Sequence, residues 1–192
     1  SAEAPVMRST DGGQTWTFVA TPEETTWQSV AYGDGVWVAV ANSGMVMRST
    51  DGGQTWTAVA VAESGQWLSL AHGDGVWVAV AKEGATRVMR STDDGATWSA
   101  TAADTEDQQW VGLAYGNGVW VSVSDAAAAT AGNVVTRSTD DGQTWTAVYL
   151  SQNQPLLDVA YGNGVWIAVA PCCGKNKVIR SIDDGQTWTG VS

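Results

Sequence analysis

The chain has 192 residues, among them 12 tryptophans and 22 glycines, and its 9 basic against 20 acidic residues give a formal charge of −11. So acidic a surface repels a phosphate backbone, which argues against nucleic acid as a partner. No apolar run approaches the roughly 20 residues of a membrane helix, so we expect a soluble chain without membrane insertion.

A ten-residue segment, RSTDGGQTWT at 8–17, recurs with small changes at 48–57, 90–99, 137–146 and 180–189. The first aspartates of successive copies are 40, 42, 47 and 43 residues apart, a period typical of propeller blades or helical arrays. Frequent Gly, Val and Thr without helical apolar spacing favour short strands. We predict an all-β repeat protein, a single domain over 1–192 with repeats at approximately 6–26, 27–66, 67–109, 110–155 and 156–192.

A second block recurs between these segments, at 27–41, 67–81, 110–124 and 156–170. In each copy two apolar runs flank Gly-Asp-Gly or Gly-Asn-Gly, residues that accept the positive φ of a tight hairpin turn. We call this pair of strands the inner hairpin. In GVWVAV the valines at 36, 38 and 40 point to one face, and Trp37 and Ala39 point to the other. Because both faces are apolar, neighbouring blades must cover both.

The ten-residue segment is predicted to be the turn of an outer hairpin. Its aspartate accepts backbone hydrogen bonds, its glycine takes the turn conformation, and its tryptophan is buried against the next blade. Burying a tryptophan contributes up to about 6 kcal/mol, against ~1 kcal/mol for a turn hydrogen bond. We therefore assign structural roles to Ser9, Asp11, Gly13, Trp16, Ser49, Asp51, Gly53, Trp56, Ser91, Asp93, Gly95, Trp98, Ser138, Asp140, Gly142, Trp145, Ser181, Asp183, Gly185 and Trp188.

The pattern Ser-x-Asp-x-Gly-x-Thr-Trp, from Ser9–Trp16 to Ser181–Trp188, resembles the Asp-box, or bacterial neuraminidase repeat. That repeat occurs in sialidases, xyloglucanases, sortilin-type receptors and photosystem II assembly propellers, so the resemblance implies a β-propeller more specifically than an activity. Five outer but four inner hairpins predict a small propeller of about five blades: four complete four-stranded blades and an N-terminal half blade. The missing inner hairpin lies in a longer chain, comes from a partner, or is absent because the half blade packs alone.

No enzyme is predicted. The resemblance to sialidases implies an arginine triad, a tyrosine nucleophile and an acidic partner, but the Arg-Ile-Pro signature is absent and Arg87 is the one arginine outside the repeats. We interpret Asp158 as a solvated residue near the channel and His72 as a packing substitute for tyrosine. The other arginines precede the boxes and are interpreted as structural neighbours of the turn: Arg8, Arg48, Arg90, Arg137 and Arg180. We expect no cofactor and no metal.

The connections between hairpins vary from copy to copy, and the turns do not. In a propeller these connections share one face of the disc, where binding specificity is usually placed. Three interpretations remain open: neutral variation, a scaffold that docks a protein partner within a larger assembly, and a lectin with Trp27, Trp67 and Trp110 as stacking platforms. Of the two functional interpretations, the scaffold is favoured over the lectin. The candidate binding-face residues are Glu24, Trp27, Glu63, Trp67, Lys82, Arg87, Glu106, Asp107, Trp110, Asp158, Cys172, Cys173, Lys175 and Lys177.

Cys172 and Cys173 are the only cysteines, and as neighbours they cannot join distant parts of the fold. They are two free thiols or a strained vicinal disulfide that stiffens a binding rim. Zinc is disfavoured because His72 lies in another repeat. The chain begins without Met, which fits a processed product, a chain shortened for expression, or a piece of a longer protein. A processed start would favour an extracytoplasmic, secreted or organelle-lumen location.

Overall fold

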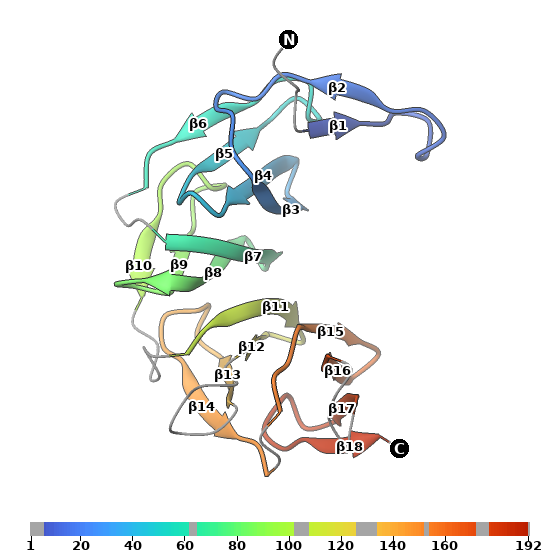
Figure 1. Cartoon of the computed structure of the whole chain (residues 1–192), viewed down its shortest axis with the longest axis vertical. Coiled ribbons are helices and arrows are strands. Elements are labelled where there is room, and N and C mark those ends of the chain that lie inside the picture. The colour runs from blue at the N-terminus through green and yellow to red at the C-terminus, as the bar shows by residue number, and fades with distance from the viewer. Residues whose placement is uncertain are drawn as a thin grey trace.

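The computed structural model describes residues 6–61, 65–101, 108–125, 134–151, 154–171 and 177–191 (Figure 1). These residues form strands and turns without a helix. Within these ranges, therefore, no helix is long and apolar enough to span a membrane.

The strands form five antiparallel sheets, each following chain order. The half blade consists of β1 (Val6–Arg8) and β2 (Thr17–Val19). Blade 2 consists of β3 (Trp27–Gly33), β4 (Val36–Ala41), β5 (Val46–Ser49) and β6 (Thr57–Val59), and blade 3 of β7 (Gly65–Gly73), β8 (Val76–Gly84), β9 (Val88–Ser91) and β10 (Ser99–Thr101). Blade 4 consists of β11 (Trp110–Gly116), β12 (Val119–Ser124), β13 (Val134–Ser138) and β14 (Thr146–Tyr149), and blade 5 of β15 (Asp158–Gly162), β16 (Val165–Val169), β17 (Val178–Ser181) and β18 (Thr189–Val191). The predicted four complete blades and one half blade are confirmed.

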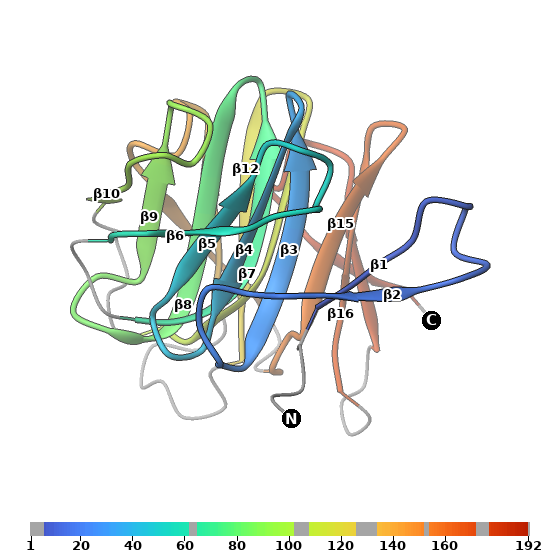
Figure 2. The same ribbon diagram turned by 90° about the horizontal axis from the view of Figure 1, so that it is seen from above.

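The blades are arranged in an open arc, with the half blade at one end and blade 5 at the other (Figure 1). The first strands of the complete blades, β3, β7, β11 and β15, are neighbours along the inner side of the arc. Seen from above, the turns of the inner hairpins lie at one edge of the molecule, and the connections from β2 to β3 and from β8 to β9 lie at the opposite edge (Figure 2). We call the first the turn edge and the second the variable edge.

The inner hairpins close as the sequence predicts. Between β3 and β4, Asp34 has a φ of 48° and Gly35 a φ of 87°. Positive φ at both central residues defines a type I′ turn, whose twist matches that of the strands it joins. Asp74, Asn117 and Asn163 take the same conformation in the other three inner hairpins.

Each pair of complete blades buries a valine face of one blade against a tryptophan face of the next. Between blades 2 and 3, the valine face is Val36, Val38, Val40 and Val46, and the tryptophan face includes Trp67, Trp77, Ala79, Met89 and Trp98. Equivalent residues form the clusters between blades 3 and 4 and between blades 4 and 5. Both faces of the second strand are covered in blades 3 and 4, as predicted, whereas Trp37 of blade 2 and Val169 of blade 5 keep part of their surface exposed.

The direction of this packing corrects one expectation. The box tryptophan was expected to lie against the next blade, but Trp98 of blade 3 packs on the valines of blade 2, the preceding blade. The box turn lies over the same valines, because a Cβ added to Gly95 would come within 2.8 Å of Val38. Trp98 is 9% exposed, whereas Trp16, at the open end of the arc, is 57% exposed.

In blades 3, 4 and 5 an aromatic ring lies on a glycine of the preceding blade. A Cβ added to Gly73 would come within 2.1 Å of the Tyr115 ring, close to the root of that side chain, where it cannot swing away. Gly33 and Gly116 are covered in the same way by His72 and Tyr161. At Gly162, in the last blade, an added Cβ would meet nothing within 4 Å.

We therefore expect Gly73→Ala and Gly162→Ala to differ, although both change the same position of the repeat. The added methyl group at residue 73 must displace the Tyr115 ring and should lower the free energy of unfolding by about 1–3 kcal/mol. The change at residue 162 should stay within about 0.5 kcal/mol. Urea unfolding followed by circular dichroism measures both, and equal effects would contradict the packing direction.

Candidate binding site

The aspartate of each box is saturated by hydrogen bonds within its own turn. In blade 5 the Ser181 hydroxyl donates to Asp183 Oδ1 over 2.7 Å, and the Thr187 amide donates to the same oxygen over 2.9 Å. The Thr187 hydroxyl donates to Oδ2 over 2.6 Å. The bonds from Thr187, then that from Ser181, lower the pKa of Asp183 from 3.8 to about 2. Both of its carboxylate oxygens are therefore engaged within the turn.

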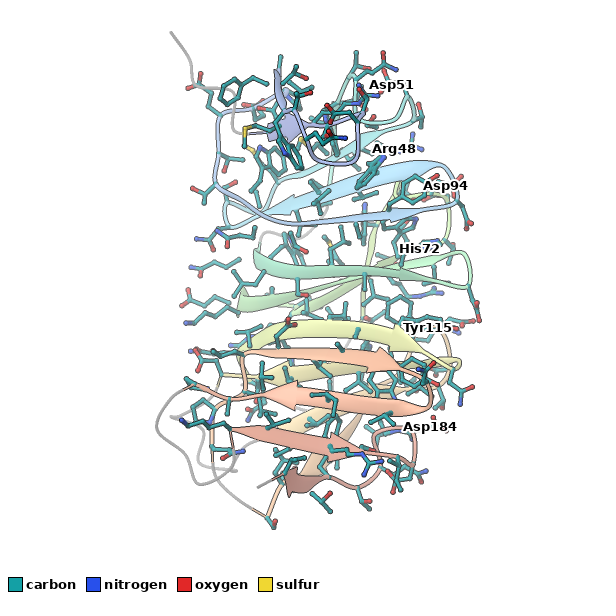
Figure 3. All side chains as sticks on the ribbon, turned by 90° about the vertical axis from the view of Figure 1, so that its right-hand side faces the viewer. Arg48, Asp51, His72, Asp94, Tyr115 and Asp184 are labelled. Carbon is teal, nitrogen blue, oxygen red and sulfur yellow. The ribbon has the colours of Figure 1, made fainter. Side chains whose placement is uncertain are left out.

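The arginine before each box reaches across to the neighbouring blade. Arg48 donates its Nε hydrogen to the backbone oxygen of Asp94 over 3.2 Å, and Figure 3 shows the two residues at the same edge. Arg90 and Arg137 make the same bond to Asp141 and Asp184, over 2.9 and 3.0 Å. These arginines are structural, as expected, but each joins its blade to the box of the next blade.

The half blade is joined to blade 2 by the same kind of arginine hydrogen bond. Arg8 donates to the backbone oxygen of Gly52 over 2.6 Å, which ties β1 to the box of blade 2. Arg180, the equivalent residue of the last blade, is exposed. Its guanidinium has no acceptor within the ranges that the structure describes, because no further box follows blade 5 there.

The turn edge carries further links between blades. The Tyr115 hydroxyl donates to Asp74 Oδ2, and burial, followed by this bond, raises the pKa of Tyr115 to about 12. His72 packs on Trp77 with ring centroids 4.6 Å apart, the position that Tyr115 takes on Trp120. Its Nε2 lies 3.3 Å from Asp34 Oδ2 without the geometry of a hydrogen bond. Figure 3 shows His72 and Tyr115 along this edge, and His72 fills a tyrosine position as predicted.

Several of the predicted binding-face residues lie at the variable edge or close to it. Glu24 is exposed before β3, Lys177 is exposed before β17, and Lys82 is half-buried in β8. Asp158 is exposed at the start of β15, where its Oδ1 accepts the Val159 amide over 2.9 Å. Arg87 is half-buried and donates to the Gln108 backbone oxygen.

Trp67 and Trp110 cannot belong to a binding face. Both are 0% exposed, because the preceding blade covers them, and the expectation that they serve as sugar platforms is wrong. Trp27 keeps part of its surface exposed because the half blade has no inner hairpin to cover it. The remaining residues of the predicted set lie outside the described ranges: Glu63, Glu106, Asp107, Cys172, Cys173 and Lys175.

A groove between the half blade and blade 2 is the concave site that sequence reasoning missed. Its cavity has a volume of about 580 Å³. Blade 2 contributes the larger wall, and β1 with the first box closes the other side. The lining includes Val6, Met7 and Arg8 of the half blade and Trp27, Val30, Trp37, Ala39, Met47 and Trp56 of blade 2. The sequence contains five outer but only four inner hairpins, and this difference was the signal that could have indicated the groove.

The described side chains contain no group of three or more His, Cys, Asp or Glu residues placed to hold a metal ion. The groove is lined mainly by apolar residues, and the box aspartates are engaged in their turns. Such an arrangement can bind an apolar polypeptide surface, because apolar side chains there gain by leaving water.

The family model described as "Photosynthesis system II assembly factor YCF48" matches residues 6–191. No curated protein matches the chain. Among solved structures, YCF48 bound to D1 peptide has a TM-score of 0.69 at 19% identity, covering 95% of this chain and 58% of that one. YCF48 from Cyanidioschyzon merolae has a TM-score of 0.63 at 17% identity, covering 88% of this chain and 56% of that one. The chain thus spans less than two thirds of the length of these structures.

An ancestral GH74 enzyme is also similar in fold, with a TM-score of 0.67 at 17% identity, covering 88% of this chain and 24% of that one. Identity at this level supports a common fold and carries no statement about activity.

The hydrogen bonds to the box aspartates predict that the protein loses stability in acid. A carboxylate whose pKa is lowered by folding stabilises the protein at pH values above its unfolded pKa of 3.8. That stability is lost as the pH falls through the folded pKa, which is about 2 for Asp11 and Asp183. The free energy of unfolding should therefore fall between about pH 4 and pH 2.

The paired variants Asp93→Asn and Asp94→Asn test this assignment in one box. Asp93→Asn removes an acceptor of the Thr97 hydroxyl, so it should cost about 1 kcal/mol at pH 7 and make the loss of stability in acid shallower. Asp94 has a φ of 57°, which Asn tolerates, and its side chain is exposed, so that variant should keep the wild-type acid profile. An unchanged acid profile for Asp93→Asn would contradict the assignment.

Proposed function

The chain belongs to the family of the photosystem II assembly factor YCF48, and from that premise we propose that it is a non-catalytic propeller module that binds a polypeptide partner during assembly of a larger complex. The observation that carries the proposal is the family match together with the similar fold of YCF48 bound to D1 peptide. A peptide of that kind is the first partner to test.

The use of the ionisable side chains supports the non-catalytic part of the proposal. The box aspartates accept hydrogen bonds inside their turns, and four of the arginines hold neighbouring blades together. General acid–base chemistry needs a positioned group with a pKa near the working pH. The carboxyl groups with shifted pKa values in the described part of the chain are moved away from neutrality, as at Asp183.

We place the partner at the variable edge. The turn edge is repetitive, and its polar groups bind one another, as Tyr115 binds Asp74 and Arg48 binds Asp94. The variable edge carries exposed charges that differ from blade to blade, among them Glu24, Asp158 and Lys177. Non-repeated side chains on a rigid scaffold can distinguish one sequence from another. A lectin is not favoured, since two of its three proposed platforms are buried.

Fluorescence anisotropy with labelled, overlapping peptides that cover the D1 protein tests the proposal. We expect saturable binding of one region of D1, weakened about two- to fivefold by Lys82→Gln or Lys177→Gln, as for the loss of a surface charge contact. Thr92→Glu, on an exposed box residue, changes the net charge by the same amount and should leave binding unchanged.

Failure of every D1 peptide and of the intact D1 protein to bind would overturn the proposed partner. Equal weakening by the lysine variants and by Thr92→Glu would overturn the placement at the variable edge, because it would report net charge rather than a local contact.

A further inference from the structure

We propose that the interface between blades 3 and 4 is the point at which the arc opens. The chain then moves as two bodies, one made of the half blade with blades 2 and 3, the other of blades 4 and 5. This interface lies in the middle of the arc, where β7 and β11 are neighbours (Figure 1). The inference concerns a conformational property of the array and goes beyond the partner binding proposed above.

One cross-strand pair of side chains distinguishes blade 4 from the other complete blades. On the tryptophan face of blade 3, Ala79 of β8 lies opposite Met89 of β9. In blade 4 the same two positions are Ser122 of β12 and Thr136 of β13. Blades 2 and 5 follow blade 3, with an alanine opposite a large apolar residue in the pairs Ala39–Met47 and Ala168–Ile179. Blade 4 therefore carries two hydroxyl groups where its neighbours are apolar.

These hydroxyl groups are buried, and their hydrogen bonds stay within blade 4. Ser122 and Thr136 are both 0% exposed, as is Ser124, whose position is alanine in the other complete blades. The Ser122 hydroxyl donates to the Gly112 backbone oxygen over 2.9 Å, and the Thr136 hydroxyl donates to the Thr146 backbone oxygen over 3.2 Å. Since both acceptors belong to blade 4, these two bonds do not join it to blade 3.

The interface between blades 3 and 4 consequently gains less from the removal of apolar surface from water. Ala79 and Met89 belong to the apolar cluster between blades 2 and 3, and Ala168 and Ile179 belong to the one between blades 4 and 5. A threonine brings fewer apolar atoms into such a cluster than a methionine or an isoleucine does. Because the stabilisation is roughly proportional to the apolar area buried, the interface between blades 3 and 4 is the weakest of the three.

A closer approach of the two blades does not compensate for the smaller side chain. The distance at which an added box Cβ would meet a valine of the preceding blade is similar in the three interfaces. It is 2.8 Å for Gly95 and Val38, 3.0 Å for Gly142 and Val78, and 3.1 Å for Gly185 and Val121. The blades are therefore spaced alike, although one interface has lost apolar contact.

Polar links at both edges cross this interface as well. The Tyr115 hydroxyl donates to Asp74 at the turn edge, and Arg87 donates to the Gln108 backbone oxygen at the variable edge. Water replaces such bonds when the blades separate, so their net contribution to stability is small. They align the two blades in the closed arc without replacing the apolar contact that blade 4 lacks.

Access of a reagent to a side chain inside each interface measures its opening, because the blades separate while their own strands stay paired. Val38, Val78 and Val121 are equivalent valines in the three interfaces, and all are 0% exposed. Each is replaced in turn by Val→Cys in the full chain, with Cys172→Ser and Cys173→Ser so that one thiol remains. The rate of reaction with Ellman's reagent is then measured under native conditions.

We expect the thiol of Val78→Cys to react at least about tenfold faster than those of Val38→Cys and Val121→Cys, as for an opening confined to one interface. Global unfolding exposes the three thiols together. Equal rates for the three variants, or a fastest reaction at another interface, would therefore overturn the proposal.

Exchange of the side-chain pair between blades tests its cause. Ser122→Ala with Thr136→Met gives blade 4 the pair of blade 3 and should slow the reaction of Val78→Cys to about the rate of Val38→Cys. The reverse change in blade 3, Ala79→Ser with Met89→Thr, should speed the reaction of Val38→Cys at least about tenfold and leave Val121→Cys unchanged. The reverse change decides the question if the larger methionine prevents blade 4 from folding. An unchanged rate for Val38→Cys in that background would overturn the proposal.

Discussion

Stacking of a valine face on a tryptophan face is the interaction on which the whole structure depends. Each complete blade presents both faces, because its second strand alternates valine or isoleucine with tryptophan and a small residue. Neither face can stay in water without cost. The valines of blade 2 cover the tryptophans of blade 3, and the series continues to blade 5. Since the order is directional, the two ends of the arc are chemically different. One end exposes a tryptophan face and the other a valine face.

The positions of the repeated polar residues, in the box turns and at the arginine before each box, depend on the same stacking. The box turns of blades 3, 4 and 5 lie over the valines of the preceding blade, and an arginine of that blade bonds to each, as Arg48 does to Asp94. Repetition of a charged residue therefore marks a link between blades rather than a catalytic group. The positions that do not repeat lie at the variable edge and at the two ends of the arc.

The sequence alone predicts the blades, the turns and the structural role of the boxes, because these depend on local patterns that recur in each copy. It does not predict the direction of stacking, since Trp98 is compatible with packing on either neighbour. Nor does it separate Trp27 from Trp67, which share the same sequence context. Trp67 is buried because a complete blade precedes it, and Trp27 lines a groove because a half blade does. The position of a blade in the series of blades decides whether its tryptophan is buried, and that position depends on contacts between residues far apart in the sequence.

Hydrogen exchange along the whole chain, resolved by mass spectrometry, tests the stacking account most directly. Amides in blades covered on both sides should open only with large parts of the fold, so β8 and β12 should exchange slowest. β1 and β2, and β17 and β18 at the other end, should exchange fastest among the strands. Protection of β1 and β2 equal to that of β8 would contradict the account, because it would mean that the half blade is stable without the cover that every other blade requires.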